Sequence, residues 1–473
     1  MIFSSTLFIF YFLPVFFIVY QLLPQRFRNY WALLASLFFY AWGAPKFVFV
    51  VTGVILVDYF IVKKIYKSDN KRLRQQLLSI SVIMKISLLA YFKYANFFVE
   101  NVDFILTHFG FTSLYWTKVV LPIGISFFTF QALTYSIDVY RNVHKPLKSV
   151  TDYLLYILLF PQLIAGPIVR YNEIADQLED RKAFETYENK ILGFFRFVIG
   201  LAKKVLIANV LGAEADHAFG LAESELTSTI AWVGILAYTF QIYFDFSGYS
   251  DMAIGLGRMM GFSFPENFNN PYVSQNITEF WRRWHMTLGR FMKDYLYIPL
   301  GGNKVTIKRM YFNLALVFVV SGFWHGAAWN FIIWGAFHGF FLIMDRLFLI
   351  NFYNKIGKYP SVVITFFLTI VGWVIFRATS FEQIIFYLKS MFRFDFDYYY
   401  LNNQVITIYI IGFIFAFITL FKFGRRIENF IFYKSNISNT QLLGYFSLIL
   451  ILFIISAASI VSSGFNPFIY FRF

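Results

Sequence analysis

The sequence predicts an all-α protein that crosses a membrane many times. Of 473 residues, 59% are hydrophobic and only 14% are charged, whereas ordinary globular domains carry about a quarter charged residues. Apolar runs recur almost from one end of the chain to the other, and short segments rich in Lys and Arg separate them. We therefore expect one integral membrane domain, residues 1–473, although this length would also permit two or three soluble domains.

A spanning helix needs about 20 mostly apolar residues, and we expect about 11 spans. Several candidate segments are short or interrupted by Pro or Gly, as in half-helices or re-entrant segments that line a central chamber. The first segment lacks a basic leader and a small-residue cleavage site, which favours a retained helix over a signal peptide. The candidates are 1–23, 30–43, 47–62, 77–98, 119–140, 151–169, 191–211, 228–244, 309–324, 328–349, 361–377, 405–423 and 441–462.

Basic loops predict the orientation of the chain in the membrane. Arg26 and Arg28 follow the first segment, and further basic residues gather in 63–74 and 141–148. Loops rich in Lys and Arg favour the cytoplasm. Placing these three loops inside requires the N-terminus to lie outside. The net charge of +15 then belongs to membrane loops, so we expect no nucleic-acid binding.

Several common chemistries lack their motifs in this chain. There is no cysteine, which excludes disulfides, thiol nucleophiles and cysteine metal sites. No P-loop, H-E-x-x-H or G-x-S-x-G sequence occurs. The acidic residue closest in sequence to His325 is Asp345, so no local carboxylate–histidine spacing suggests a metal, and we expect none.

A polar cluster surrounds the first histidine of interest. His285 lies in WRRWH, within a segment 273–300 that has too many charges to span a membrane. We expect this segment to lie at an interface or to re-enter and line a wet cavity. On a helix, Arg282 and His285 would share a face and Arg283 would point elsewhere. The alternative is an interfacial helix whose arginines bind lipid phosphate.

The other two histidines of interest lie in a long apolar stretch. His325 stands between Gly322 and Gly326. A titratable group at membrane depth is costly and by default suggests function, and a neutral imidazole there could act as a general base. His338 would lie nearly opposite His325 on a continuous helix, so both could face one site only if the helix breaks, with Asn330 as a candidate position for the break. We expect His338 to have a structural or supporting role.

A second polar island covers residues 245–272. Asp245 and Asp251 would be buried carboxylates, and we expect them to pair with Arg258 or with the arginines at 282–283. The Gly- and Asn-rich part with two prolines cannot be a regular helix. Irregular backbone survives in a membrane only inside protein or against a water-filled cavity. Two polar islands and His325 within about 100 residues predict one internal chamber.

These residues resemble the membrane-bound O-acyltransferase (MBOAT) superfamily, and specifically its alginate O-acetyltransferase (AlgI-like) branch. The combination of R-W-H with W-H-G some 40 residues later carries the likeness. The matching stretches, which lie between residues 121 and 339, are 121–141, 160–174, 245–303 and 323–339.

The resemblance implies a fold and a pair of site residues. The MBOAT fold is a ring of helices with re-entrant segments around a thinned centre. The family's catalytic histidine falls on His325 and its active-site partner on His285, with Trp324 and His338 in supporting positions. One departure is visible, because the S-L-S that often follows the R-W-H histidine is Thr287-Leu288-Gly289 here. This puts in doubt any role for a hydroxyl at position 289.

The resemblance also implies an acetyl donor and partners. The donor is expected to be cytoplasmic acetyl-CoA, with no permanently bound cofactor. The partners are an extracytoplasmic SGNH-type acetyltransferase or esterase-like protein and a polysaccharide acceptor (alginate-like exopolysaccharide, peptidoglycan or cellulose). The location is a bacterial cytoplasmic (inner) membrane. Candidate donor- or substrate-binding residues are Arg282, Arg283, Arg290, Lys293, Asp245, Asp251 and Asn330.

Two other functions stay open from the sequence. A sister branch of the superfamily transfers D-alanine to teichoic acids. A transporter for a polar lipid or sugar could use the histidines as gates or proton relays, but transporters often contain inverted repeats, and none is visible here.

Overall fold

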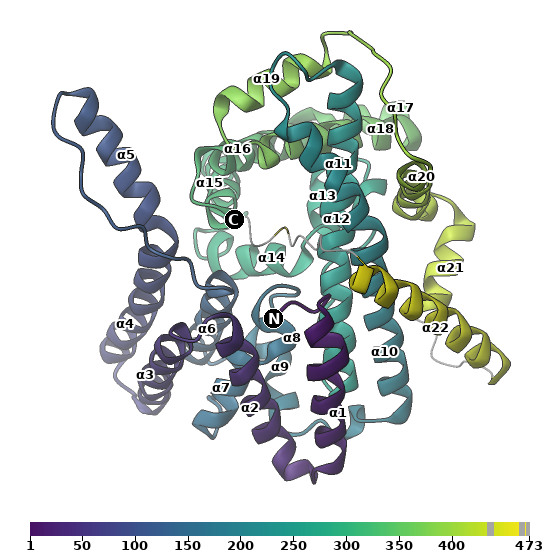
Figure 1. Cartoon of the computed structure of the whole chain (residues 1–473). Coiled ribbons are helices and arrows are strands. Elements are labelled where there is room, and N and C mark those ends of the chain that lie inside the picture. Colours follow the sequence, from purple (N-terminus) through teal and green to yellow (C-terminus); the bar gives the residue numbers. More distant parts are fainter. Residues whose placement is uncertain (433–438, 463–468, 470–473) are drawn as a thin grey trace. The chain divides into compact units, whose positions relative to one another are not determined.

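The chain forms two compact units built from helices. The computed structural model describes residues 1–432, 439–462 and 469, and every regular element in these ranges is helical (Figure 1). The first unit comprises Met1–Lys190 with Leu256–Pro265, and the second comprises Ile191–Gly255 with Glu266–Phe473. The long helix α12 runs from the second unit into the first. The prediction of an all-helical chain is confirmed for the described residues, whereas the prediction of one domain stays a prediction.

The first unit consists mainly of helices that precede the polar islands. Its first helical turns are π-type, at Phe8–Phe12, and a second π-segment at Ala90–Tyr94 joins α4 to α5. The α-helices are α1 Leu13–Leu22, α2 Gln25–Gly43, α3 Phe47–Lys67, α4 Lys71–Leu89, α5 Ala95–His108, α6 Ile125–Tyr140, α7 Val150–Leu158, α8 Phe160–Leu163 and α9 Tyr171–Glu179.

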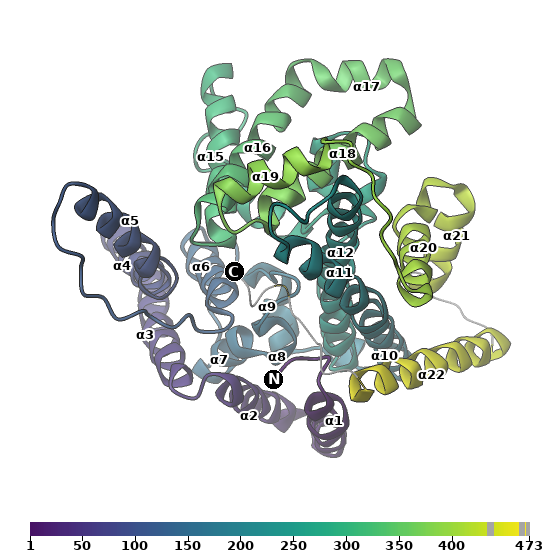
Figure 2. The same ribbon diagram turned by 45° about the horizontal axis from the view of Figure 1, so that its top comes forward.

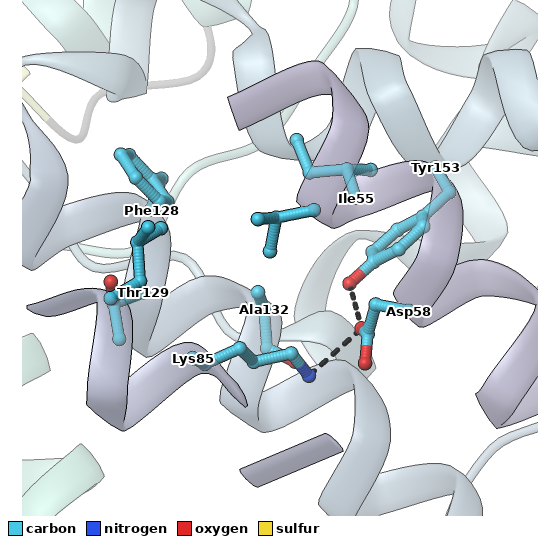
Figure 3. A pocket seen from close by; sticks show the side chains of 9 residues that line it. Ile55, Asp58, Lys85, Phe128, Thr129, Ala132 and Tyr153 are labelled. Atoms are coloured by element: carbon cyan, nitrogen blue, oxygen red, sulfur yellow. Dashed lines mark hydrogen bonds and ion pairs between the residues drawn. The ribbon is translucent and has the colours of Figure 1, made fainter. Parts of the chain in front are cut away.

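A buried ion pair lies at the contact of α3, α4 and α6 in this unit. Lys85 Nζ lies 2.8 Å from Asp58 Oδ2 and donates to Ala132 O at 2.9 Å, and Tyr153 OH donates to Asp58 at 2.5 Å (Figure 3). Asp58 is 0% exposed and Lys85 2%. A cavity of about 10 Å³ adjoins the pair. Each charge is therefore paired and hydrogen-bonded, which buried charges require.

The second unit holds the histidines of interest, the polar cluster around His285 and the two ends of the second polar island, 245–255 and 266–272. Two of its π-segments, Lys203–Ala208 and Met292–Tyr297, interrupt polar parts of the chain. Its α-helices are α10 Tyr187–Ala202, α11 Asn209–Gly220, α12 Ser228–Met259, α13 Ile277–Arg283, α14 Met286–Phe291, α15 Ile307–His325, α16 Trp329–Met344, α17 Ile350–Ile356, α18 Lys358–Arg377, α19 Phe381–Met391, α20 Asn403–Phe417, α21 Lys422–Phe432 and α22 Asn439–Ser462.

Helices α15 and α16 form a tight antiparallel pair, visible side by side in Figure 2. Glycines allow this close approach. A Cβ added at Gly322 would lie 2.1 Å from the carbonyl oxygen of Phe331, and one at Gly335 would lie 2.3 Å from that of Phe318. The pairing places His325, the last residue of α15, against the first turns of α16.

Five helices in the described part of the chain are long and apolar enough to cross a membrane. They carry many large apolar side chains on their exposed faces, as lipid-facing helices do. The expected total of about 11 spans stays a prediction, because shorter and broken segments would have to supply the rest. The five are Lys71–His108, Trp329–Ile356, Lys358–Arg377, Asn403–Leu420 and Gly444–Ser462.

Candidate active site

His285 lies at a sharp break between two short helices. Helix α13 ends at Arg283, and α14 begins at Met286. His285 itself has φ 46° and ψ 50°, the left-handed conformation that only a few non-glycine residues adopt. The expectation that Arg282 and His285 share one helical face is therefore wrong. The break turns the histidine inward, where it is 1% exposed, and leaves Arg282 at the surface.

The loop before α13, through Asn267 and Asn269, is hydrogen-bonded to the backbone on both sides of this break. Backbone hydrogen bonds run from Asn269 N to Arg283 O and from Met286 N to Asn267 O, both at 2.9 Å. The side chain of Asn267 then reaches the imidazole, and its Oδ1 lies 3.0 Å from His285 Nδ1. The ring edge of His285 also packs against Phe246, with 4.7 Å between centroids. These contacts fix both the backbone and the ring of His285.

His285 lies outside the candidate spans and is held as a neutral imidazole. Burial lowers its pKa from 6.5 to about 3, because the enclosed ring loses the water that would stabilise the imidazolium. At neutral pH the ring thus has one N–H and one lone pair.

His325 lies close to His285 within the second unit. The rings of His285 and His325 lie 6.4 Å apart, and the indole of Trp324 contacts both, at 6.2 and 4.9 Å. Helix α15 ends at His325, and α16 starts only at Trp329. The helix thus breaks just before Asn330, which is the condition under which His325 and His338 could face one site.

Aromatic rings enclose His325 and keep bulk water away. Trp334 and Phe376 pack edge-on to its imidazole at 5.2 and 5.4 Å. A cavity of about 10 Å³, roughly the space of one water molecule, lies between His325 and the rings of Phe246 and Trp284. The site is therefore relatively dry, as acyl transfer requires if hydrolysis is to be avoided.

His338 and Asn330 support this arrangement from outside it. His338 is 1% exposed and packs 5.0 Å from Trp334, which also contacts His325. Asn330 donates to the carbonyl oxygens of Phe376 and Ala378 at 3.3 and 2.8 Å, which ties the start of α16 to the end of α18. The side-chain amide of Asn330 is thus engaged with backbone.

The buried aspartates pair with cations that the sequence did not single out as their partners. Asp245 lies 2.7 Å from Lys204. Asp251 lies 2.7 Å from both Arg196 and Lys203. Pairing with Arg258 or with the arginines at 282–283 was expected and is wrong. The reason is that α10 and α12 cross closely: a Cβ at Gly200 would lie 2.4 Å from the carbonyl oxygen of Gly248.

The four cations predicted to attract the donor lie in different settings. Arg283 pairs with Glu279 at 2.8 Å. Arg290 donates to the carbonyl oxygen of Glu266 at 3.4 Å. Arg282 and Lys293 are exposed. Arg282 and Lys293 are thus available to a ligand at the surface.

A cavity of about 480 Å³ adjoins this region of the second unit. Its polar lining includes the ion-paired Arg196, Lys203 and Asp251, together with Glu266 and Asn267, and apolar side chains from α20, α21 and α22 form much of the rest. One of the lining residues, Asn267, also contacts the His285 imidazole. Sequence reasoning missed Asn267 and Arg196, although the irregular segment 245–272 was the signal for the first.

The protein's family follows from its sequence relatives. The model of the membrane-bound O-acyltransferase family matches residues 73–376, which include both histidines and the polar islands. The chain belongs to this family. It is therefore an acyltransferase and a multi-pass membrane protein, and its R-W-H and W-H-G motifs are the ones that meet in the second unit.

Curated relatives carry three related activities in their names. A probable alginate O-acetylase of Pseudomonas aeruginosa is 44% identical over 429 residues, which are 90% of this chain and 82% of the relative. A peptidoglycan O-acetyltransferase of Helicobacter pylori is 42% identical over 83% of this chain and 80% of its own. A teichoic acid D-alanyltransferase of Bacillus subtilis is more distant, at 29% over 55% of this chain and 70% of its own. The high identities favour the O-acetylating branch.

Proposed function

We propose that this protein moves acetyl groups from a cytoplasmic donor, acetyl-CoA, across the membrane for O-acetylation of an extracytoplasmic polysaccharide. The observation that carries the proposal is the meeting of His285 and His325, with rings 6.4 Å apart, in an aromatic and buried pocket. Acyl transfer needs a base held close to the acyl donor in a site that excludes water. Two relatives, 44 and 42% identical, are named as acetylating enzymes, and their names indicate an acetyl group and a polysaccharide acceptor.

In this proposal His325 is the catalytic base. It either deprotonates an acceptor hydroxyl, which then attacks the thioester carbonyl, or briefly takes the acetyl group itself. In both cases the C–S bond breaks and the CoA thiolate leaves. His285 is the partner of His325 in the site. Donors aimed at the developing oxyanion would each stabilise the transition state by about 3 kcal/mol. Trp324 contacts both imidazoles and Trp334 contacts His325, and these indoles hold the rings in place.

The donor approaches along charged and apolar surfaces of the second unit. Arg282, Arg283, Arg290 and Lys293 are proposed to attract the CoA phosphates, since guanidinium groups suit bidentate phosphate contacts. The cavity of about 480 Å³ is large enough for part of a thioester arm, and Asn267 is one of its lining residues. In the structure, Asp245 and Asp251 neutralise buried cations, so we propose that they shape this cavity rather than bind the donor directly.

The proposed membrane arrangement follows from the loops. About 11 spans would surround a central chamber, with the N-terminus outside and the basic loops in the cytoplasm. The location would be the bacterial inner membrane, and an SGNH-type extracytoplasmic partner would complete transfer to the polymer. D-alanyl transfer to teichoic acid is the alternative, and it rests on the more distant relative.

A deletion strain tests this function directly. Exopolysaccharide, peptidoglycan and teichoic acid would be isolated from wild type, deletion and complemented strains, and ester-linked acetate and D-alanine would be quantified on each. We expect acetate to fall at least about tenfold on one polymer and to return on complementation, with D-alanine unchanged. Loss of D-alanine alone would favour the alternative, and no change on any polymer would contradict both.

A further inference from the structure

The side chain of Asn267 is the centre of a buried hydrogen-bond network that the proposed roles do not use. Its Oδ1 accepts from Thr287 N at 3.3 Å and from Thr287 Oγ1 at 2.8 Å, and it lies 3.0 Å from His285 Nδ1. Its Nδ2 donates to Ser250 Oγ at 3.1 Å. Asn267 is 0% exposed. Four contacts on one buried amide leave it a single orientation.

This orientation determines which nitrogen of His285 carries the proton. A backbone N–H can only donate, so the Asn267 atom that faces Thr287 N must be the oxygen. The same oxygen faces Nδ1 of His285, so Nδ1 must be the protonated nitrogen of the neutral ring. Nε2 then carries the lone pair, and it is buried without a hydrogen-bond partner among the residues that the structure describes.

We propose that Asn267 is a positioning residue that fixes His285 in its Nδ1–H tautomer and thereby presents Nε2 to the active site as a hydrogen-bond acceptor. This inference rests on the proposed function and deepens it. An acceptor hydroxyl, or an N–H of the neighbouring His325 ring, can donate to Nε2. A neutral His285 in this tautomer cannot donate from Nε2 to an oxyanion, so oxyanion stabilisation falls to other donors.

The charged groups around this network are already neutralised. Asp251 follows Ser250 in the sequence, and Glu266 precedes Asn267. Both carboxylates pair with Arg196, at 2.7 and 2.6 Å. The titratable ring facing His285 is that of His325. A carboxylate placed at position 267 would therefore be a new charge beside His285 and would favour its imidazolium.

The test uses full-length protein in lipid nanodiscs, with Asn267→Asp and Asn267→Ala compared with wild type. Acetyl transfer from acetyl-CoA is measured from pH 3 to 8, a range that includes the His285 pKa of about 3. ¹⁵N NMR of labelled histidines reports the tautomer, with the His285 signal identified by its loss in His285→Gln. Asn402→Asp is the matched control, because Asn402 caps α20 at an exposed position and Asp caps equally well.

We expect wild-type His285 to be the Nδ1–H tautomer at pH 7. Asn267→Ala should lower kcat about 100-fold with KM within about threefold, and should shift the tautomer towards Nε2–H. Asn267→Asp should keep the Nδ1–H tautomer, recover much of the activity and move the acidic limb of the pH profile up by about one unit or more.

Two results would each overturn the inference. The first is a wild-type His285 in the Nε2–H tautomer. The second is an unshifted pH profile in Asn267→Asp combined with an unchanged tautomer in Asn267→Ala. If wild-type protein transfers no acetyl from acetyl-CoA, the donor in the proposed function is wrong, and the NMR measurement still decides the role of Asn267. A merely structural Asn267 would change protein yield but neither the pH profile nor the tautomer.

Discussion

Burial sets the protonation state of His285 and couples it to stability. The folded protein holds this imidazole neutral with a pKa of about 3, whereas the ordinary value is 6.5. Between these values the unfolded chain binds the proton more readily than the folded chain. His285 therefore costs no stability above about pH 6.5, and the folded state loses stability as the pH falls from there towards 3.

This coupling predicts an acid-sensitive protein. Lowering the pH from 7.5 to 5.0 should reduce the free energy of unfolding by about 2 kcal/mol through His285 alone. His285→Gln should lose this part of the pH dependence and behave like wild type between pH 7.5 and 8.5. Melting temperatures in detergent at each pH measure the effect. Equal pH dependence in the two proteins would show that His285 is not the group responsible.

The ion pair of Asp58 and Lys85 predicts a residue-scale effect in the first unit. Asp58→Asn leaves a buried ammonium without its counter-charge and should cost about 3–5 kcal/mol of unfolding free energy. Adding Lys85→Met removes the orphaned charge and should restore most of the loss. Chemical denaturation of the single and double variants measures both values. A double variant as unstable as the single one would contradict this account.

At the scale of elements, glycines in α15 and α16 position His325. Gly322→Ala would force a methyl group against the carbonyl oxygen of Phe331, so we expect a loss of about 2 kcal/mol or more and a lower acetylation rate as His325 moves. Gly289→Ala is the control, because its Cβ would lie 3.7 Å from the nearest atom, the carbonyl oxygen of Trp281. In a helix, Ala there should stabilise by about 0.5–1 kcal/mol. Thermal stability and acetylation are measured together, and a stable, active Gly322→Ala would be the contrary result.

Parts of these helices and of the site could be predicted from the sequence, and other parts could not. The apolar runs predicted helices, and the separate candidate spans 309–324 and 328–349 predicted an interruption beside His325. The left-handed backbone at His285 was not predictable, because that conformation is rare outside Gly and depends on the hydrogen bonds of Asn267 and Asn269. The ion pairs of Asp251 were missed because they join α10 to α12 across a glycine contact that no local periodicity reveals.

At the scale of the whole molecule, the absence of cysteine makes the topology measurable. Single cysteines would be introduced at the exposed positions Asp69 and Thr112 and treated with a membrane-impermeant maleimide. If the basic loop 63–74 is cytoplasmic, Asp69→Cys should react only after the membrane is permeabilised. Thr112→Cys, one span later, should react in intact cells. The reverse pattern would place the N-terminus inside.

The whole-molecule account depends on one claim, namely that the acyl transfer in this chain depends on His325. Ester-linked acetate on the envelope polysaccharide identified by deletion is the most direct measurement. His325→Ala would be compared with His217→Ala, an exposed histidine of α11 in the same unit, at equal membrane levels of protein. We expect His217→Ala to restore acetate and His325→Ala to leave it at the level of the deletion strain. Full acetylation by His325→Ala would contradict the account.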